Sequence, residues 1–342
     1  MQSSTTSQEI SNNNPISPHK ITANQNCPAK SLFSPSLTKS LKCSCHGFVC
    51  YNQRNNLLIV SAENIIEIYD ATTLAKIKFH ELDDWAEHVS YCEELDTYII
   101  GCDSGMIYSY NASSDELKLL QKYEQDVFTV ESVSSGFYAF VLAGSKKLHI
   151  GNLENENVVN LDWSNRDPKR FHHLVKSSLL LLSFDYGFVK IFKADKLPHL
   201  KGLCTVQAHR NKIIYELQSF CLNGKEYVIT SSDDETLKIW HFIKGRIRLL
   251  RVVQTHGRIA HSIVYLENCK MVAVSYETNY IDFFKMPSWR LERTFYLDKY
   301  TERHGLFLMK DRNSLGVVGN QGYGYHFVDF IQLYPQEEEK EV

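Results

Sequence analysis

Three cysteines and a histidine lie within ten residues in the stretch KCSCHGFVCY, which begins at Lys42. Thiolate sulfur and imidazole nitrogen are the ligands that structural zinc prefers, and a closed zinc site takes four of them. The four candidate ligands are Cys43, Cys45, His46 and Cys50. Zinc-binding cysteines usually come as two separate pairs, so this single cluster is a metal site only if the fold brings these side chains to one point.

No pattern typical of a catalytic site occurs elsewhere in the sequence. The chain has neither a GxxxxGK phosphate loop nor a GxSxG nucleophile elbow. His172 and His173 are adjacent, so on a strand they point to opposite faces and do not easily hold one metal ion. The acidic run SSDDET, from Ser231 to Thr236, has the composition of a tight turn. We therefore predict that the protein is not an enzyme and uses no cofactor.

Two sets of side chains are candidates for binding a partner. Arg246 and Arg248 are two residues apart in IKGRIRLLR, so both point to one face of a strand. They either keep a sheet edge from pairing with another chain or form a basic face for a phosphorylated peptide or an anionic lipid. Tryptophan rings beside turns either anchor a partner or fill the space between elements. The tryptophans in question are Trp85, Trp163 and Trp289.

The elements that must position these residues are short strands. Runs of β-branched and aromatic residues alternate with turns of Asn, Asp, Gly and Ser, and helical periodicity is scarce. One unit recurs seven times: an apolar strand that ends in a small residue, a tight polar turn, and a second strand. The small residues are Ser61, Gly101, Ala143, Ser183, Thr230, Ser275 and Gly319. Neighbouring copies lie 40 to 47 residues apart, which matches a four-stranded propeller blade.

The fifth copy, VITSSDDETLKIWH, resembles the signature of WD-repeat β-propellers. The resemblance covers residues 36–334 and implies a rigid propeller on which other proteins dock. In that family a His, a Ser or Thr, an Asp and a Trp form a hydrogen-bonded tetrad. The matching positions here are His209, Thr230, Asp234 and Trp240. A chain of hydrogen bonds through these four groups satisfies polar atoms that are costly to bury, so we expect it to stiffen the blade rather than to catalyse a reaction.

The other copies depart from this signature. The position of the tryptophan holds Tyr69, Tyr110, Gly151, Phe192, Phe284 and Val328. We expect these blades to be held by packing rather than by a full tetrad. A histidine also precedes the first strand of several blades, at His46, His256 and His304, as His209 does in the fifth. This repetition favours a structural role for these histidines.

A propeller ring must also close, and two segments are candidates for the outer strand of blade seven. One is Phe330 to Tyr334, and the other is Leu37 to Cys45. We favour the N-terminal segment, because it joins the two ends of the chain and removes an exposed sheet edge. Cys43 then lies in the closing strand, His46 in a loop and Cys50 in the first strand of blade one. We therefore expect no metal at this cluster.

Composition narrows the setting and the partners. The formal net charge of −3 gives no overall basic field for nucleic acid. No apolar run is long enough for a membrane span. The nine cysteines are an odd number and lie mostly in apolar runs, which indicates free thiols in a reducing compartment. The N-terminus lacks the apolar core of a signal peptide, so we predict a cytoplasmic or nuclear location.

We therefore predict an all-β protein with one seven-bladed propeller over residues 36–334. Residues 1–35 form a polar tail that we expect to be disordered, and residues 335–342 form a short acidic tail. The predicted function is a non-catalytic scaffold on which other proteins assemble into a complex. The alternative is a propeller that binds a modified peptide or an anionic lipid through Arg246 and Arg248. We expect no nucleic acid partner, and peripheral lipid contact is the weaker alternative.

Overall fold

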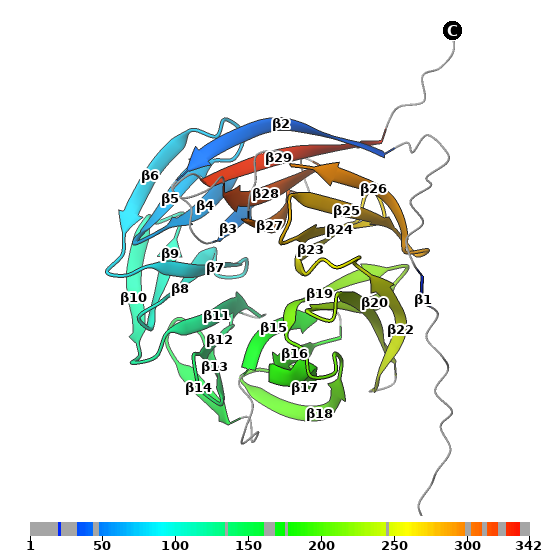
Figure 1. Ribbon diagram of the computed structural model, residues 1–342. Helices are drawn as coiled ribbons and strands as arrows, with labels where there is room; N and C mark the ends of the chain where they lie inside the picture. Colours follow the sequence, from blue (N-terminus) through cyan, green and yellow to red (C-terminus); the bar gives the residue numbers. More distant parts are fainter. Residues whose placement is uncertain are drawn as a thin grey trace, which may run out of the picture.

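The computed structural model describes ten stretches of the chain. They are residues 20–21, 33–43, 48–133, 136–160, 168–174, 177–243, 246–297, 302–309, 313–320 and 326–335. Within them the regular elements are β-strands, apart from one short 3-10 helix at Asp185–Gly187. The strands form seven sheets around a common axis, which confirms the predicted seven-bladed propeller (Figure 1).

Each blade has four antiparallel strands in its sheet, numbered outward from the axis. Blade one has β3 (Val49–Asn52), β4 (Leu57–Ala62), β5 (Ile65–Asp70) and β6 (Lys76–Glu81), and blade two has β7 (Ala86–Cys92), β8 (Thr97–Cys102), β9 (Met106–Asn111) and β10 (Glu116–Lys122). Blade three has β11 (Val127–Ser132), β12 (Tyr138–Leu142), β13 (Lys147–Gly151) and β14 (Glu156–Asn160), and blade four has β15 (Pro168–Leu174), β16 (Leu179–Phe184), β17 (Phe188–Lys196) and β18 (His199–Gln207). Blade five has β19 (Ile214–Leu222), β20 (Lys225–Ser232), β21 (Thr236–Ile243) and β22 (Arg246–Gln254), and blade six has β23 (Ala260–Leu266), β24 (Met271–Tyr276), β25 (Tyr280–Lys285) and β26 (Arg290–Tyr296). Blade seven has β27 (Glu302–Met309), β28 (Ser314–Asn320), β29 (His326–Pro335) and, outermost, β2 (Phe33–Cys43).

The innermost strands make a closed circle around the axis. Each of them contacts the innermost strand of both neighbouring blades, so that β3, β7, β11, β15, β19, β23 and β27 lead back to β3. The segments that lead into these strands lie at the same end of the blades as the turns between second and third strands. Backbone hydrogen bonds join the two sets, as between Asp103 N–H and the Trp85 carbonyl at 3.0 Å. We call this end the entry face.

The core lies between the blades. Every position of β8, β16 and β24, the second strands of blades two, four and six, is buried. Neighbouring blades cover both faces of these strands, so their sequences read as continuous apolar runs rather than as an alternating pattern. Each large cluster of buried side chains accordingly combines residues from adjacent blades, as Phe220 of blade five does with Tyr276 of blade six. The blades therefore stabilise one another.

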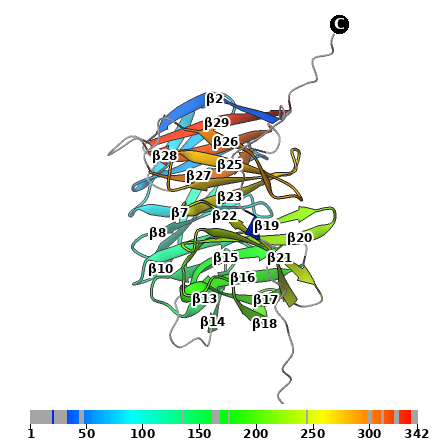
Figure 2. The same cartoon turned by 45° about the vertical axis from the view of Figure 1, so that its right-hand side comes forward.

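The first and last strands of the ring are neighbours in one sheet. β2 pairs antiparallel with β29, with Leu41 opposite Val328 and Ser36 opposite Gln332. The hydroxyl of Thr38 also donates to the Phe330 carbonyl oxygen at 3.0 Å. The two strands run side by side along the outside of blade seven (Figures 1 and 2). The outer strand of this blade therefore comes from the N-terminal part of the chain.

The chain outside the ring is described only in part. Within the N-terminal segment that we expect to be disordered, Lys20–Ile21 (β1) pairs parallel with Val252 and Val253 of β22. The other residues before Phe33 and all residues after Pro335 lie outside the described part, so the disorder of the two tails stays a prediction. None of the helices in the described ranges has the length and apolar character needed to span a bilayer.

Strand register corrects one detail of the repeat alignment. In blades five and six a shift between the third and fourth strands directly precedes Trp240 and Phe284. The same shift in blade seven precedes Ile331. The residue that takes the place of the tryptophan in blade seven is therefore Ile331 and not Val328, because the last repeat is displaced by three residues.

Removing residues 1–43 should destabilise the ring, because it deletes β2 and exposes the backbone edge of β29. We expect the melting midpoint, followed by circular dichroism, to fall by roughly 5–10 °C or more. Size-exclusion chromatography should show self-association of the shortened chain. A chain that lacks only residues 1–31 is the control and should melt like the full chain. Equal melting of both would show that β2 does not hold the ring closed.

Candidate functional site

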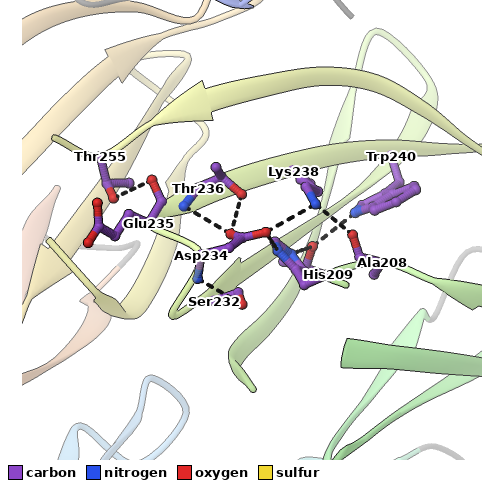
Figure 3. A network of polar contacts seen from close by, with 10 residues as sticks. Ala208, His209, Ser232, Asp234, Glu235, Thr236, Lys238, Trp240 and Thr255 are labelled. Atoms are coloured by element: carbon purple, nitrogen blue, oxygen red, sulfur yellow. Dashed lines mark hydrogen bonds and ion pairs between the residues drawn. The ribbon is translucent and has the colours of Figure 1, made fainter. Parts of the chain in front are cut away.

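The four residues of the predicted tetrad meet in blade five, and Figure 3 labels His209, Asp234 and Trp240 among them. His209 is fully buried in the segment that leads into β19. Its Nδ1 lies 2.8 Å from the Asp234 carboxylate, and its Nε2 lies 2.8 Å from the Thr230 hydroxyl. The indole N–H of Trp240 donates to the same hydroxyl at 3.0 Å. Burial lowers the pKa of His209, so the imidazole is neutral, donating from Nδ1 and accepting at Nε2.

Further bonds hold the carboxylate of the tetrad in place. Asp234 accepts from the backbone N–H of Thr236 at 3.1 Å and pairs with the Lys238 ammonium at 3.2 Å. Burial alone would raise the pKa of Asp234, but the hydrogen bonds from His209 and Thr236 and the charge of Lys238 together outweigh burial and hold this pKa well below its usual value. Lys238 also donates to the Ala208 carbonyl at 2.8 Å. The tetrad therefore ties the segment entering β19 to the β20–β21 turn and to the third strand, which is a structural task.

Other blades place different polar groups at the equivalent position of their third strand. Strand register puts Glu67, Tyr108, His149, Lys190, Lys238, Asp282 and Asp329 at this position, one in each blade. In blade six the carboxylate of Asp282 accepts from Tyr276 at 2.9 Å and from Thr294 at 2.6 Å, and it lies 3.7 Å from Arg258. Blades without the tetrad are therefore held by polar bonds as well as by packing. The sequence signal is a polar residue two positions before the place of the tryptophan.

A bulge recurs at the start of the innermost strands. In blades two to seven the register with the second strand shifts within the first few residues. A bulge turns a side chain away from the regular pleat. Phe128 of blade three occupies such a bulge and is exposed, and the cations of Lys169 and Arg170 lie 5.3 and 5.8 Å from its ring. In blades five and six the bulge residues Tyr215 and His261 stack edge to face at 4.9 Å.

Exposed apolar side chains stand directly before the innermost strands of three blades. Phe48, Trp85 and Ile213 are 39%, 50% and 41% exposed. The carbonyls of Trp85 and Ile213 accept backbone hydrogen bonds from the turn between the second and third strands of their own blades, and the Phe48 carbonyl accepts one from Ser61 near the end of β4. Trp85 and Ile213 are therefore held at corresponding points of the entry face, and Phe48 is held on the same face of blade one. The Phe48 ring also packs at a tilt against the buried His88 ring of blade two, with the ring centres 4.3 Å apart, which connects Phe48 to the innermost strand of that blade.

Polar side chains of the innermost strands also form hydrogen bonds from one blade to the next. His172 of blade four lies 3.3 Å from the Glu131 carboxylate of blade three and 2.9 Å from the Ser219 hydroxyl of blade five. Burial raises the pKa of Glu216, in the same strand as Ser219, to about 7. A carboxylate, an imidazole and a hydroxyl in this order can activate a serine, but here they join three neighbouring strands. Sequence reasoning missed this set, since its members are one blade apart in the chain.

Comparison with known proteins agrees with this architecture. No family model matches the sequence. The crystal structure of the Myceliophteria thermophila Cps50 (Swd1) β-propeller domain superposes with a TM-score of 0.73 at 12% identity, covering 86% of this chain and 99% of that one. At this identity the likeness shows the fold alone. A Gallus gallus protein, p21-activated protein kinase-interacting protein 1-like, is 28% identical over 116 residues. That match covers 31% of this chain and 30% of the relative, less than a third of its length.

The chain folds as a seven-bladed β-propeller, and blade five carries the hydrogen-bonded tetrad expected from its resemblance to WD-repeat propellers. Its predicted tryptophan anchors differ in their placement. Trp85 is half-exposed on the entry face, whereas Trp289 is only 6% exposed and packs against the Phe220 ring at 6.2 Å. Trp289 therefore fills the space between blades five and six, which is the second of the two roles predicted for these tryptophans. Trp163 lies outside the described residues.

The structure also shows where the residues of the predicted basic face and of the cysteine cluster lie. Arg246 and Arg248 are both exposed on β22, the fourth strand of blade five. In the cysteine cluster, Cys43 is buried in β2 and Cys50 lies in β3, while Cys45 and His46 lie outside the described residues. Burial raises the pKa of the Cys50 thiol to about 12, which disfavours the thiolate that a metal needs. No group of metal-ligating side chains occurs in the part of the chain that the structure describes.

Replacing His209 with alanine should be the most damaging change in the tetrad. His209→Ala leaves both the Asp234 carboxylate and the Thr230 hydroxyl without their buried partner, so we expect the free energy of unfolding to fall by about 2–4 kcal/mol. Trp240→Phe keeps an aromatic ring and loses one neutral hydrogen bond, so about 1 kcal/mol is expected. Urea unfolding measures both. Equal, small effects would contradict a hydrogen-bonded role for the imidazole.

His88 should make the propeller less stable in acid. Burial, with a smaller effect of the Arg170 charge, lowers the pKa of His88 to about 3, whereas an unfolded histidine titrates near 6.5. Between these values the unfolded chain takes up a proton that the folded chain refuses, so stability falls as the pH drops, by up to about 1.4 kcal/mol per pH unit. His88→Asn should flatten this fall between about pH 6 and pH 4 in urea unfolding. The exposed His256→Asn is the control and should keep the wild-type slope.

Proposed function

We propose that this propeller is a non-catalytic scaffold that binds other proteins on its entry face. The observation that carries the proposal is a set of exposed apolar side chains, Phe48, Trp85 and Ile213, held by backbone hydrogen bonds directly before the innermost strands of three blades. Large apolar side chains on a rigid frame are typical anchors of protein interfaces, because they bury area at little cost in conformational entropy. The backbone hydrogen bonds of these three residues fix the distances between their side chains on the surface that a partner would contact.

The polar chemistry of the ring supports a structural rather than a catalytic use. The tetrad of blade five and the carboxylate of Asp282 in blade six are occupied by bonds within their own blades. His172 is likewise occupied by Glu131 and Ser219 of the neighbouring blades. These bonds hold loops and strands together, which favours a rigid platform.

The comparisons support protein partners in general. The chicken relative is named for its interaction with a kinase, which is a property of that protein. We take from it only that a protein with a related stretch of sequence is named for binding another protein. No disulfide joins the described cysteines, which supports the cytoplasmic or nuclear location that we propose.

The alternative function keeps one observation in its favour. Arg246 and Arg248 are exposed on the fourth strand of blade five, where a phosphorylated peptide or an anionic lipid could pair with both guanidinium groups. Changing both to Glu should abolish binding of such a ligand without lowering the melting midpoint. If vesicles with anionic lipid or phosphopeptides bind the variant as well as the wild type, the arginines only protect the strand edge.

Crosslinking mass spectrometry in the native cell tests the scaffold proposal. We expect partner crosslinks to concentrate on the entry face and to be lost in the triple variant Phe48→Ser, Trp85→Ser, Ile213→Ser. The matched control is the double variant Phe79→Ser, Tyr296→Ser, which removes side chains 54% and 56% exposed on fourth strands. Crosslinks that survive in the triple variant but vanish in the control would contradict the proposal and would show that partners bind the outer strands instead. Turnover of a substrate by the purified protein would replace the proposal with an enzymatic one.

A further inference from the structure

Trp85, the most exposed tryptophan among the described residues, stands among carboxylates. Asp83 and Asp84 precede it in the same turn, and the backbone N–H of Asp103 donates to its carbonyl at 3.0 Å. Asp126 lies at the corresponding place before the innermost strand of blade three. We call these five residues the acidic tryptophan patch.

The carboxylates of this patch are held in place and act on one another. Tyr108 donates its hydroxyl to the Asp83 carboxylate at 3.1 Å, and the backbone N–H of Ser104 donates to Asp84. Burial raises the pKa of Asp103, and the neighbouring charges of Asp126 and Asp84 raise it further. Carboxylates from the turns of two adjacent blades therefore act on one another around the exposed Trp85, and the Lys122 charge acts on Asp84 from the side.

A cation is the complement of this arrangement. A guanidinium group can stack on an indole face while its N–H groups pair with carboxylates, and it does both better than an ammonium group because it is planar and more weakly hydrated. A phosphorylated peptide or a nucleic acid would be repelled by the same charges. The exposed indole also supplies apolar contact that free ions do not use.

We propose that the acidic tryptophan patch binds an arginine-containing segment of a partner protein. The inference rests on the proposed scaffold function and adds which side chain of a partner protein the entry face would bind. The segment comes from another protein rather than from the N-terminal tail of this chain, because residues 1–35 contain no arginine. The C-terminal run PQEEEKEV is acidic and would be repelled.

Binding of short synthetic peptides to the full chain tests this inference. Fluorescein-labelled peptides carry arginine, singly or in pairs, in a background of Gly, Ser and Leu, and fluorescence polarisation follows their binding. Matched peptides have lysine or glutamate in place of arginine. We expect the arginine peptides to bind, the lysine peptides to bind several-fold more weakly, and the glutamate peptides not to bind. Binding should weaken as salt is added.

Two variants and two controls locate the binding. Trp85→Ala should weaken the arginine peptide about tenfold. The triple variant Asp84→Asn, Asp103→Asn, Asp126→Asn should weaken it at least as much and remove most of the salt dependence. Tyr186→Ala removes an exposed ring from the blade-four turn of the same face, and Glu154→Gln removes a charge from a turn at the opposite end of blade three. Both controls should bind as the wild type does.

Three results would overturn the inference. They are no binding of any arginine peptide up to about 1 mM protein, equal binding of glutamate peptides, and undiminished binding by Trp85→Ala. None of these results removes the scaffold proposal, because crosslinks at Phe48 and Ile213 test that proposal independently. If the wild-type protein gives no partner crosslinks on the entry face, both proposals fail.

Discussion

Pairing of β2 with β29 is the interaction on which the rest of the propeller depends. The blades bury their apolar faces against each other, so a break at one seam exposes a face of blade seven and a face of blade one together. β2 covers the outer edge of the last sheet, and its residues Leu41 and Cys43 belong to the cluster shared with blade one. The circle of innermost strands, the turns of the entry face and the spacing of Phe48, Trp85 and Ile213 all follow from a ring that stays closed.

A second constraint acts inside each blade. Register places a polar side chain at one position of every third strand, and most of these side chains are buried. A buried polar group needs partners, but nothing demands that each blade supply the same ones. In blade five Lys238 bonds with Asp234 of the tetrad and the Ala208 carbonyl, in blade six Asp282 bonds with Tyr276, Thr294 and Arg258, and in blade one Glu67 bonds with Tyr69 and Lys76. The WD-repeat signature fades in the sequence because the blades meet one requirement with different residues.

This explains how far the sequence could predict the structure. The number of blades could be predicted from the spacing of the repeats, and the buried strands could be predicted from their apolar runs. The tetrad could be predicted because the residue types of the fifth copy match the signature at all four positions. The register of blade seven did not follow, because Val328 and Ile331 are equally apolar and only the shift against β2 distinguishes them. The burial of Trp289 depends on Phe220, 69 positions away in sequence number, in the adjacent blade. The hydrogen bonds of His172 join it to partners 41 and 47 residues away in the chain, so they could not be read from local sequence. Polar residues in several first strands were the only sequence signal for such bonds.

Closure by an N-terminal strand has a consequence for how the protein is made. Thr38 and Phe330, which bond across the seam, are separated by 292 positions. During synthesis on the ribosome β2 therefore emerges first and finds its partner last. The intervening blades can form local hairpins as they appear, but the final ring waits until β29 has left the exit tunnel. Until then the nascent chain carries an unpaired strand and an open apolar face, which makes it a substrate for chaperones while the finished ring is not.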